Sequence, residues 1–259
     1  HEAASDGTGV WVLTLGDALF GAPLRVASRV LFQEHAGLRG GSVHVEAASS
    51  LRVAVGQMLG STGAGLEMSV SRGEAVERRR IVEELVGVDA EGVFVRRPVV
   101  HTAGTHLVSG GRGGLGGLIA GRLVERGAGR VVLMGRTVPA EAIEHGGAAV
   151  VAAVCDVSQQ VMVDAVVAAL GCNVAGVIHA AGAISVVSGG NVDLGVLSSM
   201  FAAKADGALA LHKALASVPV GVFLMTSSTG SALPQPGQTA YGAANGFLEA
   251  LAVRRRSEG

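Results

Sequence analysis

The chain contains the stretch HLVSGGRGGLG at residues 106–116, and this stretch decides the fold. Its apolar Leu107 and Val108 predict a strand, and residues 115–125 predict a helix. Glycines between a strand and a helix allow positive φ and a close approach to a ligand, and the start of the helix points N–H groups at a diphosphate. We therefore predict a dinucleotide-binding loop made of Gly110, Gly111, Arg112, Gly113, Gly114, Leu115 and Gly116.

Strands and helices continue to alternate after this loop. Apolar runs predict further strands at residues 130–134, 148–154, 174–178 and 220–225, with helices in the intervals, notably at residues 197–215. Such alternation is typical of a parallel sheet that is covered by helices on both faces. The sequence therefore predicts an α/β fold with a doubly wound, Rossmann-like parallel sheet.

The front of the chain has the same alternation but no phosphate-binding turn. It predicts elements in the order β-α-β-α-β at residues 10–15, 24–35, 42–46, 51–59 and 66–70, and a charged connector at residues 78–97. That order is half of a doubly wound sheet. We expect a partial second Rossmann-like subdomain with its connector at residues 1–100, and the cofactor-binding catalytic subdomain at residues 101–259.

Composition argues against several classes of function. The 259 residues carry a formal net charge of −1 with no basic stripe, so binding to nucleic acid or to an anionic membrane is not expected. No apolar run reaches the ~18 residues of a membrane span. Cys155 and Cys172, the only cysteines, lie in apolar runs, which predicts reduced core thiols in a cytoplasmic protein and no metal site.

Residues that end the next two strands bear on the choice of dinucleotide. NAD would favour an acidic residue that accepts from its ribose 2′-hydroxyl, but the strand at residues 130–134 leads into Arg136. A guanidinium suits a 2′-phosphate, so we predict NADP(H), with Arg112 as a second positive charge. Asp156 suits equally a hydrogen bond from the adenine amino group and an ordinary helix N-cap.

Three polar residues near the C-terminus mark a second candidate site. Ser228 follows the strand at residues 220–225, Tyr241 is the only tyrosine, and Asn245 lies one turn further along the same helical face. With these residues the chain resembles the short-chain dehydrogenase/reductases, and specifically the ketoreductase domain of modular type I polyketide synthases. Ordinary members of the superfamily carry a lysine four residues after the tyrosine. Here Asn245 stands in that place and Lys204 lies upstream, as in polyketide ketoreductases.

Other motifs extend the resemblance over residues 104–259. A Lys-x-x-Gly-Ala run begins at Lys204, His-Ala-Ala-Gly occupies residues 179–182, and Pro-Gly-Gln precedes the tyrosine at residues 236–238. A fainter resemblance covers the front of the chain, which is similar to the second half of the cofactor-free structural subdomain of the family. His179 is expected to be structural.

The resemblance implies a reaction and a set of residues. Tyr241 would donate a proton and Ser228 a hydrogen bond to the oxygen of a ketone, while Lys204 would lower the tyrosine pKa from ~10 and hold the nicotinamide ribose. Asn245 would orient Tyr241 or support a proton relay through water. The expected contacts to NADPH, besides the glycine loop, are Arg136, Asp156, Val157, Ala180, Ala181, Gly182, Lys204 and Tyr241.

The resemblance also implies partners. The expected substrate is a β-ketoacyl thioester on the phosphopantetheine arm of an acyl carrier protein, reduced to the β-hydroxyacyl thioester beside neighbouring polyketide synthase domains in the cytoplasm. Two alternatives stay open: a free-standing short-chain reductase of a small ketone, and a non-reducing scaffold or epimerase-like domain. The upstream lysine argues against the first, and the retained glycine loop and catalytic residues argue against the second.

The sequence departs from the family at several places. The Leu-Asp-Asp motif that usually marks one hydroxyl configuration is replaced by residues 184–186, Ile-Ser-Val, and the tryptophan of the opposite type is replaced by Leu233. The missing acidic motif favours the L-hydroxy type. Family members also continue past the tyrosine helix into a strand and a lid, so we expect a fragment of a longer polypeptide. An intact source protein near the chain mass of 25.8 kDa would contradict this.

Overall fold

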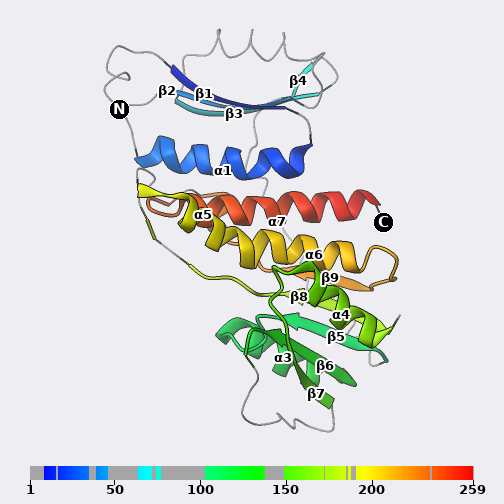
Figure 1. Cartoon of the computed structure of the whole chain (residues 1–259). Helices are drawn as coiled ribbons and strands as arrows, with labels where there is room; N and C mark the ends of the chain where they lie inside the picture. Colours follow the sequence, from blue (N-terminus) through cyan, green and yellow to red (C-terminus); the bar gives the residue numbers. More distant parts are fainter. Residues whose placement is uncertain are drawn as a thin grey trace, which may run out of the picture. The chain divides into compact units, whose positions relative to one another are not determined.

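A computed structural model describes residues 9–15, 17–34, 39–45, 64–71, 74–76, 103–137, 149–171, 173–184, 186–187, 191–233 and 235–258. These residues belong to two compact units. The first unit draws on residues 1–80, 183–205 and 227–259, and the second on residues 81–182 and 206–226. Figure 1 shows the elements of both units, coloured along the sequence.

The second unit contains a five-stranded parallel sheet in the order β7-β6-β5-β8-β9. Its strands are β5 (Thr105–Ser109), β6 (Arg130–Gly135), β7 (Ala149–Val154), β8 (Val174–His179) and β9 (Val222–Met225). Its helices are α3 (Gly114–Glu125), α4 (Gln160–Leu170) and α6 (Gly207–Ala214). The order reverses direction at β5, from which the chain winds first to β6 and β7 and then to β8 and β9. This confirms the predicted doubly wound sheet.

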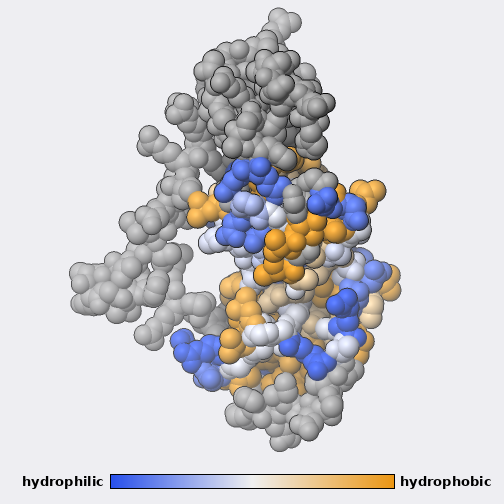
Figure 2. Space-filling model, turned by 90° about the vertical axis from the view of Figure 1, so that its left-hand side faces the viewer, coloured by the Kyte–Doolittle hydropathy of each residue, from blue (hydrophilic) through white to orange (hydrophobic). Residues whose placement is uncertain are grey.

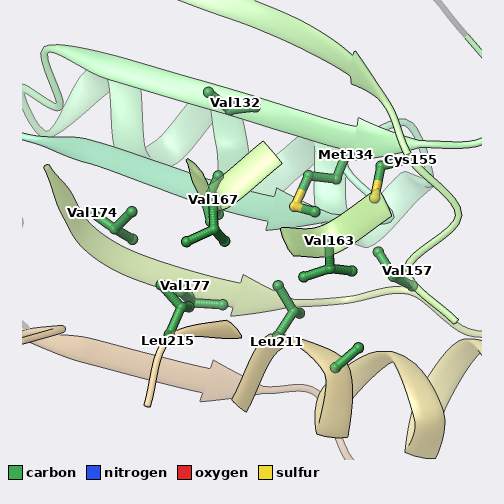
Figure 3. Close-up of a cluster of buried hydrophobic side chains, with 12 residues drawn as sticks. Val132, Met134, Cys155, Val157, Val163, Val167, Val174, Val177, Leu211 and Leu215 are labelled. Atoms are coloured by element: carbon green, nitrogen blue, oxygen red, sulfur yellow. The ribbon is translucent and has the colours of Figure 1, made fainter. Parts of the chain in front are cut away.

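Alternate residues of the strands supply the core on the two faces of this sheet. Leu107 belongs to a buried cluster with residues of α4 and α6. Figure 3 shows Val132 of this cluster together with Val163 of α4 and Leu211 of α6. Val108 belongs to a second buried cluster with residues of α3. Because the central strands are buried on both faces, β6 appears in the sequence as a continuous apolar run rather than an alternating one. Strand β5 is equally buried but combines apolar Leu107 and Val108 with polar residues.

Gly207, at the start of α6, allows that helix to pack closely on its neighbours. A Cβ there would lie 2.8 Å from Val157 Cγ2 and 3.0 Å from His179 Cε1. In contrast, a Cβ at Gly121 on α3 would meet nothing within 4 Å. The glycine of the Lys-x-x-Gly-Ala run therefore has a packing reason within this unit.

We expect Gly207→Ala to lower the free energy of unfolding by about 1–3 kcal/mol, because the added methyl overpacks a buried contact. The matched control, Gly121→Ala, is expected to raise it by up to ~1 kcal/mol, because alanine restricts the unfolded chain and suits a helix. Urea unfolding of both variants checks the opposite signs. A Gly207→Ala protein as stable as the Gly121→Ala protein would contradict the packing argument.

The first unit contains a four-stranded sheet in the order β1-β2-β3-β4, from β1 (Gly9–Leu15), β2 (Arg39–Val45), β3 (Ala64–Ser71) and β4 (Glu74–Val76). The first three strands are parallel, and β4 is antiparallel to β3. The long helix α1 (Ala18–Glu34) has this sheet on one side and α7 (Thr239–Glu258) on the other (Figure 1). The predicted partial Rossmann-like half is thus present, and α7 packs on its helix.

Several sequence expectations about this region differ from the structure or lie outside it. Helix α1 begins at Ala18 rather than at residue 24, because Asp17 Oδ1 accepts a hydrogen bond from Leu19 N at 2.8 Å and so supports an earlier first turn. The predicted helix at residues 51–59 and the connector at residues 78–97 lie outside the described residues. So does the boundary between residues 100 and 101, and the division into two domains there stays a prediction.

Cys155 lies free and buried in the core of the second unit. Burial, with the negative charge of Asp156 as a second cause, raises the pKa of its thiol to about 11. Such a thiol is not a nucleophile near neutral pH. Cys172 is not among the described residues, and within those residues no three His, Cys, Asp or Glu side chains group as metal ligands do.

One helical stretch, Leu194–Ala214, is long and apolar enough to cross a membrane by length and composition alone. The core helix of a soluble enzyme meets the same criterion, and Lys204 lies in the middle of this stretch. The absence of a membrane span therefore stays a prediction. Elsewhere apolar side chains such as Ile184 and Leu233 remain exposed, and Figure 2 shows apolar surface in orange between hydrophilic patches.

Candidate active site

The predicted catalytic side chains all belong to the first unit. Tyr241 and Asn245 lie in the first turns of α7, and Ser228 lies just before the short 3-10 turn η5 (Thr229–Ser231). Lys204 lies between α5 (Leu194–Phe201) and α6, in the π-helical turn η4 (Ala202–Asp206). Its Nζ lies 5.4 Å from the centroid of the Tyr241 ring. At this distance the ammonium interacts with the ring face, so the structure brings the lysine and the tyrosine together.

Lys204 is buried, with 5 % of its surface exposed. Burial disfavours the ammonium and lowers the pKa of Lys204 below its ordinary value. The π-helical turn that carries it interrupts an otherwise regular helical stretch, and such single-turn insertions occur frequently at functional sites. The sequence predicted a continuous helix here, because the extra residue of a π turn leaves no mark on the apolar pattern.

Asn245 is fully buried behind the first turn of α7. Its Nδ2 donates a hydrogen bond to the carbonyl oxygen of Tyr241 at 2.8 Å. Its Oδ1 is also buried and has no hydrogen-bond partner among the residues that the structure describes. A buried amide oxygen without a protein partner suits a water molecule or a ligand group that donates to it.

Ser228 is half-buried and caps η5. Its Oγ accepts a hydrogen bond from Gly230 N at 3.1 Å, and its carbonyl oxygen accepts one from Ser231 N at 3.1 Å. The hydroxyl hydrogen of Ser228 is not used by that bond, so it is available to a substrate oxygen. Sequence reasoning singled out Ser228 but none of the residues that hold this turn, which include Arg29 and Glu249.

The glycine loop lies in the second unit, between β5 and α3, as predicted. Gly110 has φ +67°, and a Cβ there would lie 2.7 Å from both Cα and N of Ala181. A Cβ at Gly116 would lie 2.2 Å from the carbonyl oxygen of Gly110, and one at Gly111 would lie 2.7 Å from Leu133 Cδ2. These glycines are therefore required by the packing of the loop on the protein itself.

Gly114, in the same loop, has a different environment. A Cβ at Gly114 would meet nothing within 4 Å, so this side of the loop is open. Helix α3 begins there with no acidic residue in its first turn, and Gly113 offers no side chain to cap it. An uncapped helix N-terminus at an open glycine fits the diphosphate of a dinucleotide, because its N–H groups favour an anion.

Arg136 follows β6, and Arg112 of the glycine loop reaches the same place. Arg112 Nη1 donates a hydrogen bond to Thr137 Oγ1 at 2.5 Å, which draws this loop residue to the residue that follows Arg136. Arg136 lies near enough to Asp156 to contribute to the lowered pKa of that carboxyl group, for which the side-chain and backbone hydrogen bonds from Ser158 are the larger causes. The pair of guanidiniums fits a 2′-phosphate.

Asp156 has a local structural use as well. Its Oδ1 accepts hydrogen bonds from Ser158 N at 3.0 Å and from Ser158 Oγ at 2.7 Å, which closes a turn ahead of α4. Gln159 occupies the N-cap position of α4, but its side chain makes no capping hydrogen bond. The carboxyl group therefore organises the turn before α4, and its contact to an adenine ring stays a prediction.

The His-Ala-Ala-Gly motif follows β8 and lies against the end of β5. Ser109 Oγ and His179 Nδ1 are 2.7 Å apart, and Ala180 N donates to the carbonyl oxygen of Ser109 at 3.1 Å. Ala181 N donates to Ser109 Oγ at 3.4 Å. His179 is fully buried in this network, as its expected structural role requires. The side chain of Val157 lies in the core, and Gly182 ends this segment of the unit.

Comparison with known proteins gives this arrangement a family context. The family model for the KR domain matches residues 104–259. The chain is 34 % identical over 250 residues to one subunit of the phenolphthiocerol/phthiocerol polyketide synthase of Mycobacterium tuberculosis, a match that covers 92 % of this chain and 13 % of that protein. It is 38 % identical over 174 residues to polyketide synthase GfsA of Streptomyces halstedii, covering 62 % of this chain and 2 % of that one.

Solved structures agree with these matches. A structure of A-type ketoreductases from a modular polyketide synthase has a TM-score of 0.79 at 27 % identity and covers 98 % of this chain and 57 % of its own. The first ketoreductase of the tylosin polyketide synthase has a TM-score of 0.75 at 29 % identity and covers 96 % of this chain and 57 % of its own. The chain therefore spans a small part of the curated relatives and just over half of these solved chains.

Proposed function

Because the chain belongs to the KR domain family, the ketoreductases of polyketide synthases, we propose that it reduces a carrier-bound β-ketoacyl thioester to the β-hydroxyacyl thioester with NADPH. The observation that carries this proposal is the buried Lys204, which lies 5.4 Å from the ring centroid of Tyr241. In most short-chain reductases that lysine comes from the tyrosine helix. Here Asn245 holds that place and the lysine comes from η4, which is the arrangement of polyketide ketoreductases.

The residues of the first unit supply the acid and the electrostatics of the reduction. Tyr241 gives its phenolic proton to the ketone oxygen as negative charge develops there, and Ser228 donates a hydrogen bond to the same oxygen. The ammonium of Lys204 stabilises the phenolate that remains on Tyr241. The unpartnered Oδ1 of Asn245 accepts from a water that returns a proton to the tyrosine, while its Nδ2 holds the backbone of Tyr241.

The residues of the second unit would hold the cofactor. NADPH supplies the hydride when it is bound. The open side of Gly114, at the uncapped start of α3, would receive its diphosphate. Arg112 and Arg136 bind its 2′-phosphate, and this pair is what favours NADPH over NADH.

The partners follow from the relatives, which are polyketide synthases by name and of which the chain covers 13 % or less in the examples above. We propose that neighbouring synthase domains flank this one in the cytoplasm, and that an acyl carrier protein presents the thioester on its phosphopantetheine arm. The missing Leu-Asp-Asp motif favours the L-hydroxy product.

A turnover assay tests the proposal. The loss of NADPH absorbance is followed with a diketide β-ketoacyl thioester and, in parallel, with simple ketones. Turnover of the thioester in preference to the ketones supports the proposed function, and chiral analysis of the product assigns the hydroxyl configuration. Preference for simple ketones would support a free-standing reductase. If the chain does not bind NADPH, the result would support a non-reducing scaffold.

We expect Arg136→Ala to weaken NADPH binding about 10- to 100-fold, because one charge-assisted contact to a phosphate is worth about 1.5–3 kcal/mol. NADH lacks the 2′-phosphate, so its affinity is expected to stay within about twofold. Calorimetric titration with both cofactors measures the difference. The matched control is Arg122→Ala on α3, whose guanidinium pairs with Glu125. Equal losses for NADPH and NADH would contradict the assigned role.

A further inference from the structure

The turn that carries Ser228 is held on both sides by one carboxylate. Ser227 Oγ donates a hydrogen bond to Glu249 Oε1 at 2.9 Å, and Ser231 Oγ donates to the same oxygen. Ser231 Oγ also lies 2.6 Å from the carbonyl oxygen of Ser228. Glu249 comes from α7, two turns after Tyr241. The residue before Ser228 and the last residue of its turn are therefore fixed to the helix that carries the tyrosine.

Helix α1 reaches the same turn from the other end of the sequence. Arg29 Nη1 donates a hydrogen bond to the carbonyl oxygen of Ser231 at 2.5 Å. Arg29 and Glu249 line one groove between α1 and α7. Ser231 is thus held twice: its carbonyl oxygen accepts from the Arg29 guanidinium, and its hydroxyl donates to the Glu249 carboxylate. Hydrogen bonds to ionised groups are stronger than those between neutral groups.

The last residue of α1 holds the turn that precedes Tyr241. Gly237, with φ +79°, donates its N–H to Glu34 Oε1 at 2.6 Å. Helix α7 then begins at Thr239. Close packing fixes the two helices to each other, because a Cβ at Gly246 would lie 2.7 Å from Val26 Cγ2. Both turns that present the proposed acid and its serine partner are therefore fastened to α1.

We propose that Arg29 and Glu34 of helix α1, together with Glu249 of α7, are positioning residues that set the place of Ser228 and of the start of the Tyr241 helix. The inference rests on the proposed reductase function. It gives the front part of the chain, which carries no glycine loop, a direct role in turnover. A misplacement of about 1 Å at a reacting group costs as much as ~100-fold in rate, so fastening these turns matters for catalysis.

Substitution of Glu249 in the full chain separates positioning from folding. We expect Glu249→Ala to lower kcat about 10- to 100-fold, because the turn loses its shared acceptor, while the Kd for NADPH stays unchanged. Glu249→Gln keeps an acceptor oxygen for both serines and is expected to stay within about threefold of the parent chain. On α1, Arg29→Met removes the donor to Ser231 and is expected to lower kcat as Glu249→Ala does. Arg29→Lys keeps a cationic donor and is expected to stay near the parent chain, as Glu249→Gln does.

The matched control is Arg254→Ala. Arg254 Nη1 donates to Asp17 Oδ2 at 3.0 Å, so this change removes another tie between α7 and the start of α1 without touching either turn. Thermal unfolding of all variants shows whether each is folded. If Arg254→Ala lowers kcat as much as Glu249→Ala does, loose packing of the helices explains the effect and positioning is overturned.

A double-mutant cycle with Ser228→Ala completes the test. If Glu249 acts by placing Ser228, Glu249→Ala is expected to cost less than about twofold once the serine hydroxyl is gone. An unchanged, full cost in the Ser228→Ala background would overturn the inference and leave the reductase function standing. A parent chain that binds NADPH but reduces no thioester would overturn the proposed function and, with it, this inference.

Discussion

Replacement of Tyr241 by phenylalanine is expected to lower kcat for a β-ketoacyl thioester about 10²- to 10⁴-fold, the usual contribution of a positioned general acid. The reason is that the change removes only the hydroxyl that gives its proton to the ketone oxygen. The ring remains for Lys204, whose Nζ lies 5.4 Å from its centroid, so the buried ammonium keeps its packing partner. No other tyrosine is present in the chain to take over the proton transfer.

The measurement is steady-state NADPH oxidation, with NADPH affinity and unfolding followed in parallel. Affinity and stability are expected to change little, because Asn245 still holds the backbone oxygen of residue 241 and the glycine loop lies in the other unit. Ser199→Ala, which removes an exposed hydroxyl from α5, serves as the control. A Tyr241→Phe chain that keeps more than about a tenth of the parent turnover would show that Tyr241 is not the acid.

The sequence predicted those features of the fold that depend on residues close together along the chain. Strand β6 is buried on both faces, so it appears as an apolar run, and the glycine loop is a continuous stretch between a strand and a helix. The pairing of Lys204 with Tyr241 was predictable only through the family resemblance. Spacing along the chain does not bring residues from η4 and α7 together.

The parts that could not be predicted depend on distant partners. Arg29 and Ser231 lie 202 positions apart, and Glu34 and Gly237 lie 203 apart, so nothing in the local pattern connects them. Helix α1 carries an amphipathic pattern that indicates a buried face but not which helix covers it. The π turn at Lys204 depends on backbone hydrogen bonds that side-chain periodicity does not report.

Gly110 offers the second large effect. We expect Gly110→Ala to raise the Kd for NADPH more than tenfold and to lower the free energy of unfolding by about 1–3 kcal/mol. The residue combines φ +67° with a Cβ position 2.7 Å from the backbone of Ala181, so both the loop and the chain after β8 must shift. Those two segments are predicted to line the cofactor site together, and a shift of either one moves the N–H groups at the start of α3.

Gly114→Ala tests whether an added methyl in this loop clashes with the bound cofactor even where it does not clash with the protein. Its Cβ would meet nothing within 4 Å, so the variant is expected to be as stable as the parent or up to ~1 kcal/mol more stable, since alanine suits the first turn of a helix. NADPH affinity should nevertheless fall, because the new methyl occupies the side from which the diphosphate approaches. Urea unfolding and calorimetric titration of both variants measure the two effects. A stable Gly114→Ala chain with undiminished NADPH affinity would mean that the diphosphate does not bind at the start of α3.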